Sequence, residues 1–413
     1  MDHVKGLKCV LCGGEYATDE TLYTCPKCGV QGILDVVYDY RLIGDRLTKE
    51  KLADNPDRSI WRYADLLPIA NEQLIPPLHV GWTPLYHPEQ LGRSLGLERL
   101  FIKDDGRNPT ASFKDRASAI GVIKARELGF GIITCASTGN AASSLAGFAA
   151  SVGLPTVIFV PERAPTAKVA QLLIFGAHVL SVKGTYDEAF DLCLEASEEY
   201  GWYSRSTAIN PYLSEGKKTG ALEVCEQLHW QVPDKMFVSV GDGCIIGGLW
   251  KGLQDLYALG FIDRMPQLVG VQAEGSAPLV TTWEQGTEEI EPIIPETIAD
   301  SISVGIPRDG IKALRAVYES DGMYVAVSDD EILEAMRLLG RQAAVFAEPA
   351  GATGFAGLLK LLGEGRVGSN ERVVVLVTGN GLKDTETAIK AVGTPHSVEP
   401  NMDAVRELVA SWR

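Results

Sequence analysis

Lys114 lies at the centre of the stretch 108–116 (Asn-Pro-Thr-Ala-Ser-Phe-Lys-Asp-Arg), whose residue types could carry chemistry. It follows a strand-like run at 100–103 and stands just before a helical pattern at 116–128. Ser112 is a good helix N-cap, and Asp115 three residues later nearly completes a capping box. A lysine in the first helical turn meets the positive end of the helix dipole, and burial there would add desolvation. Both effects favour the uncharged amine, which can form a Schiff base with a carbonyl cofactor; the alternative is a lysine that reaches solvent.

Three further loops follow strand-like runs. Residues 136–141 (Ala-Ser-Thr-Gly-Asn-Ala) offer hydroxyls and exposed N–H groups that suit a carboxylate. Residues 241–248 (Gly-Asp-Gly-Cys-Ile-Ile-Gly-Gly) could cradle a phosphate, and residues 377–382 place Thr378 at a strand end. Each loop alone could be an ordinary cap or turn. In an open parallel sheet, however, sites form in such loops at the carboxyl ends of strands.

Together the four loops meet the needs of pyridoxal phosphate (PLP). Its aldehyde requires a lysine, its phosphate an amide cradle and its ring nitrogen a polar partner. A threonine hydroxyl such as that of Thr378 would leave the ring nitrogen largely unprotonated, which suits elimination or replacement at the substrate's side chain. A nicotinamide dinucleotide is disfavoured, because the third glycine of the loop at 241–248 comes one residue too late for that fingerprint.

Four cysteines near the N-terminus have the spacing of a metal site. They form the pattern C-x2-C-x12-C-x2-C, and their positions are Cys9, Cys12, Cys25 and Cys28. Two such knuckles can hold one zinc in a closed and therefore structural site. A metal-free remnant or a pair of disulfides is the alternative.

The order of the patterns predicts an α/β protein with a largely parallel sheet. Helical patterns alternate with strand-like runs at 100–103, 131–137, 155–161, 178–182, 235–240, 267–274 and 372–378. We expect two doubly wound α/β domains with the cofactor in the cleft between them. The expected boundaries are a zinc-ribbon-like segment at 1–35, a small domain at 131–213, and a large discontinuous domain at 36–130 and 214–413.

Composition limits the partners. The 413 residues carry a net charge of −16, which argues against nucleic acid and anionic membranes. The most apolar window, 132–160, is interrupted by polar and glycine–proline stretches. The first residues lack the apolar stretch of a secretory signal, so a cytoplasmic location is expected.

The chain resembles the threonine synthase branch of the fold-type II (tryptophan synthase β-like) PLP enzymes. The resemblance covers residues 80–390 and rests on four motifs at 108–116, 136–140, 348–352 (Glu-Pro-Ala-Gly-Ala) and 377–384. A cysteine-rich start also occurs in this branch. The resemblance implies a homodimeric PLP-dependent lyase that abstracts the α-proton of a small amino acid and eliminates or replaces a side-chain group.

The resemblance also implies roles for single residues. Lys114 would bind the cofactor and carry the proton, and Asn140 would contact the cofactor's 3-hydroxyl. Phe113 would support the ring site, and Thr378 would bond the ring nitrogen. The substrate would face Ser137, Thr138, Gly139 and Asn140. The cofactor phosphate would be lined by Gly241, Asp242, Gly243, Cys244 and Ile245.

Three positions depart from the pattern by which threonine synthases hold the phosphate of O-phosphohomoserine. Ala208 stands in place of a serine, Leu213 in place of an arginine and Ile245 in place of an asparagine, whereas Thr138 matches. Loss of the arginine would leave a substrate phosphate poorly paired. Within the lysine motif the usual glycines are Ala111 and Ala117, a milder change.

Alternative functions therefore stay open. A threonine synthase would have to rebuild its phosphate recognition from lysines such as Lys217, Lys218 or Lys168. A relative would instead be a hydroxyamino-acid dehydratase, a diaminopropionate-type ammonia-lyase, or a β-replacement enzyme such as cysteate synthase. From another class, a non-catalytic metabolite sensor would have no need of Lys114, Asn140 and Thr378 together.

Overall fold

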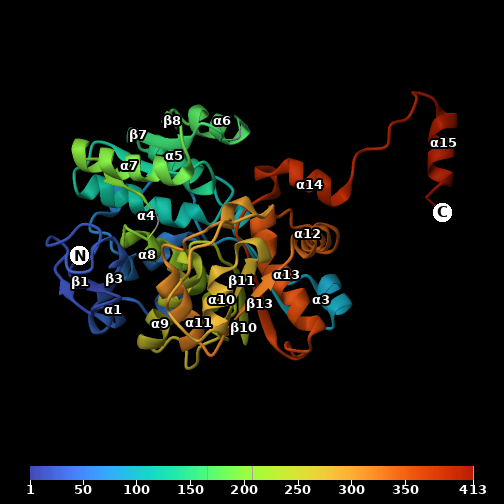
Figure 1. Cartoon of the computed structure of the whole chain (residues 1–413). Coiled ribbons are helices and arrows are strands. Elements are labelled where there is room, and N and C mark those ends of the chain that lie inside the picture. Colours follow the sequence, from blue (N-terminus) through green and yellow to red (C-terminus); the bar gives the residue numbers. More distant parts are fainter. Residues whose placement is uncertain (165, 207, 413) are drawn as a thin grey trace.

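The structure is a computed structural model that describes residues 1–164, 166–206 and 208–412, and the strands in these ranges form three sheets (Figure 1). The smallest sheet is antiparallel, has the order β2-β1-β3, and contains β1 (Val4–Cys9), β2 (Glu15–Tyr16) and β3 (Leu34–Tyr38). It lies at the N-terminal end beside α1 (Tyr40–Arg46), and α2 (Lys49–Asp54) follows α1 in the chain.

The largest sheet has the order β12-β11-β10-β13-β5-β4, and its neighbouring strands are parallel except for the pair β4–β5. Its strands are β4 (Leu85–Tyr86), β5 (Arg99–Asp104), β10 (Lys235–Ser239), β11 (Gln267–Ala273), β12 (Met323–Val327) and β13 (Arg372–Val377). This arrangement confirms the predicted parallel α/β sheet.

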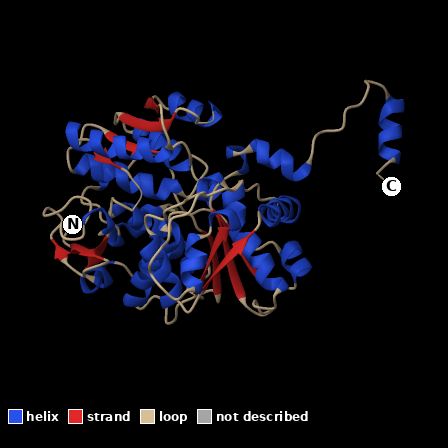
Figure 2. Cartoon of the chain, viewed as in Figure 1, coloured by secondary structure: helices blue, strands red, loops and turns tan. Residues whose placement is uncertain are grey.

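Both faces of the largest sheet are covered, as Figure 2 shows by the helices around it. Along β10, Met236 and Val238 join one hydrophobic cluster, while Phe237 joins the other, as the two-residue period of a strand requires. The first cluster includes side chains from α4 (Lys114–Glu127), α8 (Tyr212–Gln227), α9 (Cys244–Ala258), α10 (Pro278–Glu284) and α11 (Gly310–Glu319). The second includes side chains from α3 (Glu89–Leu95), α12 (Asp329–Ala343) and α13 (Pro349–Gly363).

A second parallel sheet has the order β8-β7-β6-β9. Its strands are β6 (Ile133–Ala136), β7 (Thr156–Pro161), β8 (His178–Val182) and β9 (Tyr203–Ser204). It packs with α5 (Asn140–Ser151), α6 (Thr166–Ile174) and α7 (Tyr186–Tyr200). The sheet thus lies within the range predicted for a small domain, although the domain boundaries themselves stay a prediction.

The C-terminal elements are α14 (Thr385–Val392) and α15 (Met402–Ala410); α15 stands apart from the body in Figure 1, and none of its residues is buried. Short 3-10 helices connect the larger elements: Gly29–Gln31, Ile60–Leu66, Glu72–Leu74, Asp105–Arg107, Glu274–Ser276, Asp300–Ile302 and Gly381–Lys383. Among the described helices, none has both the length and the hydropathy needed to cross a bilayer.

Candidate active site

A cavity of about 690 Å³ is lined by loops of both parallel sheets, and Lys114 is part of its wall. The loop after β6 contributes Ser137, Thr138, Gly139 and Asn140. The loop after β10 contributes Gly241, Asp242, Gly243, Cys244 and Ile245. Both loops leave the carboxyl ends of parallel strands, so the sheets bring together residues far apart in the sequence.

Lys114 is the first residue of α4 and is half-buried. Desolvation lowers the pKa of Lys114 below its ordinary value, and the positive charge of Arg205 adds to this effect. The nearby groups Cys244, Asp242 and Glu348 act in the opposite direction. The amine is therefore shifted towards the uncharged form that a nucleophile or base requires.

The prediction that Ser112 caps this helix is wrong. Phe113 occupies the N-cap position without a side-chain cap, and α4 begins two residues earlier than the predicted pattern at 116. Ser112 instead bridges to Gly379, and its buried hydroxyl has no hydrogen-bond partner among the described residues. Asp115 is not part of a capping box, because its carboxylate accepts from the N–H (2.6 Å) and the hydroxyl of Thr110.

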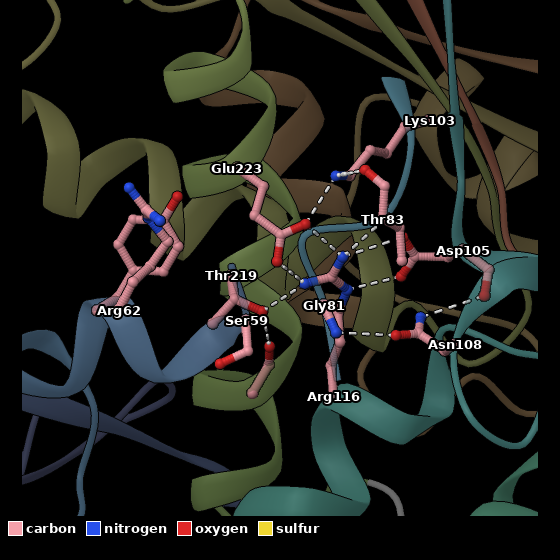
Figure 3. A network of polar contacts seen from close by, with 12 residues as sticks. Ser59, Arg62, Gly81, Thr83, Lys103, Asp105, Asn108, Arg116, Thr219 and Glu223 are labelled. Atoms are coloured by element: carbon pink, nitrogen blue, oxygen red, sulfur yellow. Dashed lines mark hydrogen bonds and ion pairs between the residues drawn. The ribbon is translucent and has the colours of Figure 1, made fainter. Parts of the chain in front are cut away.

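A buried ionic network fixes the start of α4 (Figure 3). The guanidinium of Arg116 donates to Asp105 (Nε–Oδ2 2.6 Å) and to both carboxylate oxygens of Glu223, and all three side chains are almost fully buried. Lys103 also donates to Glu223 (2.7 Å), and Thr83 donates its hydroxyl to Asp105 (2.6 Å). The network therefore joins β5, α4 and α8 two residues beyond Lys114.

The motif loops are also joined by their backbones. The N–H of Phe113 donates to the carbonyl of Thr378 (2.8 Å), and the N–H of Asn380 donates to the carbonyl of Ala111 (3.1 Å). The N–H of Glu348 donates to the carbonyl of Gly379 (3.1 Å). A Cβ at position 379 would lie 2.0 Å from Glu348 Oε1, so any larger residue there would displace the Glu348 carboxyl. Three separate sequence motifs are thus joined by backbone hydrogen bonds into one frame next to Lys114.

Asn140 connects this frame to the loop after β6. Its side-chain amide donates to Glu348 Oε1 (2.6 Å), and Asn140 is also the first residue of α5. Within the same loop the N–H of Gly139 donates to the hydroxyl of Ser137 (3.2 Å). The turn therefore holds its amide groups at the cavity wall in a defined conformation.

The comparisons with known proteins identify the family. The model of the family described as "pyridoxal-phosphate dependent enzyme" matches residues 77–379. The chain belongs to this family of PLP-dependent enzymes. It is 42% identical to the threonine synthase of Methanocaldococcus jannaschii over 404 residues, which are 97% of this chain and 98% of the relative. It is also 42% identical to the threonine synthase of Methanosarcina acetivorans over 405 residues, 98% of each. The protein is thus a PLP-dependent lyase of threonine synthase-like type.

Solved structures agree in fold. A diaminopropionate ammonia lyase from Escherichia coli has a TM-score of 0.67 at 18% identity, covering 82% of this chain and 93% of that one. A threonine deaminase from Solanum lycopersicum has a TM-score of 0.65 at 23% identity, covering 75% and 87%. At these identities the likeness supports the fold-type II architecture and nothing finer.

The loop after β10 fits the phosphate of PLP. Gly243 has φ of +92°, and a Cβ there would lie 2.7 Å from Ala313 Cβ and 2.9 Å from the carbonyl oxygen of Asp309. The loop leads into the N-terminus of the 15-residue helix α9, whose first N–H groups have no acceptor within the helix. The carboxylate of Asp242 accepts from the N–H of Arg308 (3.3 Å), so its charge is turned towards that arginine.

Four predicted site residues are not part of the cavity wall within the described ranges. Phe113 and Thr378 belong to the hydrogen-bonded frame next to Lys114, and Ala208 and Leu213 are the other two. Lys218 is wrong as a phosphate ligand, because Asp255 (2.7 Å) and Glu215 (2.5 Å) already pair with it in the core.

The other two lysines proposed as phosphate ligands have different surroundings. Lys168 forms an ion pair with Asp300, whereas Lys217 lines the cavity. Lys217 is therefore the predicted lysine that still faces the cavity without an ion pair in the described part of the chain.

Several residues of the wall were not predicted from the sequence, above all Arg205, Ser206 and Tyr186. Arg205 follows β9, which is two residues long and gives no alternating pattern to recognise. If β9 had been recognised in the sequence, the position of Arg205 directly after a strand would have indicated a site residue. Tyr186 begins α7, whose capping box at Thr185 and Glu188 is readable in the sequence.

The buried carboxyl of Glu348 predicts a pH effect on stability. Burial raises the pKa of Glu348 to about 7, even though the hydrogen bond from Asn140 and nearby lysines act against this. Because the folded pKa exceeds the unfolded one, the stability that Glu348 contributes is present below about pH 4.5 and is lost as the pH rises through 7. Glu348→Gln keeps the acceptor for Asn140 but cannot ionise, so this loss should disappear.

We therefore expect the difference in free energy of unfolding between cofactor-free Glu348→Gln and the parent protein to shift by about 3 kcal/mol in favour of the variant from pH 5 to pH 9. Urea unfolding midpoints at the two pH values measure this difference. The exposed Glu98→Gln should show no such change with pH. A Glu348→Gln difference that is the same at both pH values would contradict the assignment.

The four N-terminal cysteines meet as predicted. Their sulfur atoms all lie within 4.8 Å of one another, and Cys12 Sγ lies 3.7 Å from Cys25 Sγ, too far for a disulfide. Gly13 and Gly29, which follow the two pairs, have φ of +69° and +63°, the left-handed conformation of a knuckle turn. The donor set suits a tetrahedral thiolate site for zinc.

Proposed function

We propose that the protein is a threonine synthase, which converts O-phosphohomoserine and water into threonine and inorganic phosphate. The observation that carries the proposal is the arrangement of the cavity. Lys114, with its lowered pKa, lies at the wall together with the turn 137–140 and the glycine-containing loop 241–245. Full-length identity of 42% to two threonine synthases supports the same activity.

We assign the steps to residues of this chain as follows. PLP, when bound, supplies the electron sink that makes the protons on the substrate's Cα and Cβ removable. Lys114 binds the cofactor, takes the proton from Cα, and later returns a proton to the carbon skeleton. The N–H groups of the loop 137–140 hold the substrate carboxylate, and Asn140 meets the cofactor's 3-hydroxyl.

The remaining cofactor contacts belong to the same proposal. The loop 241–245 and the start of α9 hold the cofactor phosphate, and Phe113 supports the ring from within the frame. Thr378 donates its hydroxyl hydrogen to the unprotonated ring nitrogen. Its backbone bond to Phe113 (2.8 Å) supports this placement, because it ties the ring partner to the residue before Lys114.

A second function is a hydroxyamino-acid dehydratase or a diaminopropionate-type ammonia-lyase. The observation that favours it is the apolar side chain of Ile245 at the cavity wall, together with the absence of an arginine at position 213. Both functions begin with removal of the α-proton by Lys114. In the first, phosphate leaves from Cγ and water then adds at Cβ, whereas in the second a hydroxyl or amino group leaves from Cβ.

Product analysis separates the two functions. The purified protein with PLP is incubated with O-phosphohomoserine, serine, threonine or diaminopropionate. Threonine and phosphate in equal amounts from the first substrate support the threonine synthase. Ammonia and a ketoacid from one of the others, with no phosphate release, would support the ammonia-lyase instead.

We also propose that the cysteine cluster holds one structural zinc. All four ligand positions are filled by thiolates, so the ion should not take part in catalysis. We expect about one zinc per chain by metal analysis, and a loss of zinc with a lower unfolding temperature in Cys25→Ser. Ser197→Ala, away from the cluster, serves as the control. If the parent protein keeps its unfolding temperature after zinc is removed, the ion is not structural.

Finally, we propose a cytoplasmic homodimer. The resemblance to threonine synthases supports both the location and the assembly. Apolar side chains on and before α14 are exposed, with Leu382 at 71% and Val392 at 62%, and a partner subunit would cover such residues. A mass of one chain by light scattering at micromolar concentration would contradict the dimer.

A further inference from the structure

Two buried cations line the cavity in addition to Lys114. Arg205 is 1% exposed and Lys217 is 3% exposed, and both belong to the wall. Arg205 follows β9, and its N–H donates to the carbonyl of Thr134 (2.8 Å). Lys217 lies on α8. The two side chains therefore reach the same cavity from two different elements.

Neither cation is neutralised by the described residues. Arg205 Nε donates to the hydroxyl of Ser118 (3.3 Å), whereas its buried Nη2 has no hydrogen-bond partner within residues 1–164, 166–206 and 208–412. For Lys217 there is no hydrogen bond and no carboxylate within 4 Å in the described ranges, in contrast to the neighbouring Lys218. A buried charge without a partner is costly, so these groups call for an anion.

The carboxyl of Asp309 acts on Lys217 through its charge but makes no hydrogen bond with it in the described part of the chain. Asp309 is 1% exposed, and neither of its oxygens has a hydrogen-bond partner among the described residues. Burial raises the pKa of Asp309, while desolvation lowers the pKa of Lys217 to about 8. At neutral pH Lys217 therefore stays mainly charged, and the charge of Arg205 close by is part of what lowers its pKa.

Position along α8 explains why this lysine is available. Lys217 follows Leu213 by four residues, one helical turn, and therefore lies on the same face of α8. Leu213 is buried in the core, where an arginine is expected in threonine synthases. At Gly248 of α9, a Cβ would lie 2.7 Å from Lys217 Cβ, so this glycine leaves room for the lysine stem beside the phosphate-binding helix.

We propose that Arg205 and Lys217, with Ser206 beside them, form a subsite for a phosphate monoester and thereby select a phosphorylated amino acid as substrate. The inference rests on the proposed function, and it replaces the missing arginine at position 213 by two other cations. The same chemistry would suit the cofactor's phosphate. We assign the subsite to the substrate, because the loop 241–245 already offers the cofactor a helix N-terminus.

The test uses the holoenzyme and the variants Arg205→Gln and Lys217→Gln. Both keep a polar side chain of similar length and remove the charge. We expect the KM for O-phosphohomoserine to rise about 10- to 100-fold in each variant, because a charge-assisted hydrogen bond is lost. Inhibition by inorganic phosphate should weaken to a similar extent. The affinity for PLP, measured from the visible absorbance of the bound cofactor, should change less than about twofold.

Three further proteins make the test decisive. Lys217→Arg and Arg205→Lys keep the charge and should retain phosphate inhibition, which separates charge from folding. The exposed Lys183→Gln should behave like the parent protein. A loss of PLP affinity with unchanged phosphate inhibition would overturn the proposal in favour of the cofactor's phosphate, and unchanged values for all ligands would overturn it altogether.

The phosphate subsite can be tested even if the protein lacks threonine synthase activity. If the parent protein does not convert O-phosphohomoserine, perturbation of the cofactor absorbance by inorganic phosphate still reports the subsite. Phosphate binding that is lost in both Gln variants would then uphold the subsite while the proposed function falls. Absence of phosphate binding in the parent protein would overturn the subsite itself.

Discussion

Replacing Lys114 by alanine should abolish activity, with a loss of at least about 1,000-fold, because the variant loses both the cofactor-binding amine and the general base. The same change should remove the visible absorbance band of the lysine-bound cofactor. The lowered pKa of Lys114 and its place in the cavity wall lead to this expectation. Absorbance scans and turnover assays with the proposed substrate measure the two effects.

A matched control is Lys390→Ala on α14, where the side chain is exposed. It should keep both the band and the activity. If Lys114→Ala retains the band, a different lysine binds the cofactor. If it loses the band but keeps the biological function, the protein acts as a metabolite sensor rather than as an enzyme.

The second large effect should come from Arg116. Arg116→Gln leaves the buried carboxylates of Asp105 and Glu223 without their main partner, and we expect the free energy of unfolding to fall by about 3–5 kcal/mol. Burial by itself would raise the pKa of Glu223, yet Arg116 and Lys103 lower it to about 2, which reflects a strongly coupled network. Activity should also fall, because the network fixes the helix start that carries Lys114.

Urea unfolding followed by circular dichroism measures the change. Arg315→Gln is a suitable comparison, because its ion pair with Glu288 lies at the surface and should contribute less than about 1 kcal/mol. Equal losses in the two variants would show that burial of the Arg116 network adds nothing to stability.

Much of the fold and of the site could be predicted from the sequence. Strands such as Val373–Val377 of β13 form continuous apolar runs, because parallel strands are buried on both faces. Three predicted site segments each follow such a strand: Lys114, the turn at 137–140 and the glycine loop at 241–248. Because sites in parallel sheets form at the carboxyl ends of strands, their common cavity could be predicted.

Other features depend on contacts between distant segments. Ser112 has the side chain of an N-cap, but its backbone bridges to Gly379, more than 200 residues away. Lys218 and Lys217 are neighbours in the sequence, and only the packing of α8 against α9 decides that one is paired with Asp255 and the other faces the cavity. Local patterns do not contain this information.

Arg205 illustrates a third limit. The short strand β9 places it at the cavity, where it pairs through the backbone with the segment at Thr134. A strand of two residues has neither a periodicity nor an apolar run. Arg205 could therefore be assigned to the phosphate subsite only from the pairing of β6 with β9.

The decisive experiment compares O-phosphohomoserine with homoserine, which has the same carbon skeleton but no phosphate. We expect conversion of O-phosphohomoserine to threonine and phosphate in a 1:1 ratio, and no detectable product from homoserine. Equal handling of the two compounds, or silence with both while serine or threonine yields ammonia and a ketoacid, would contradict the proposed function.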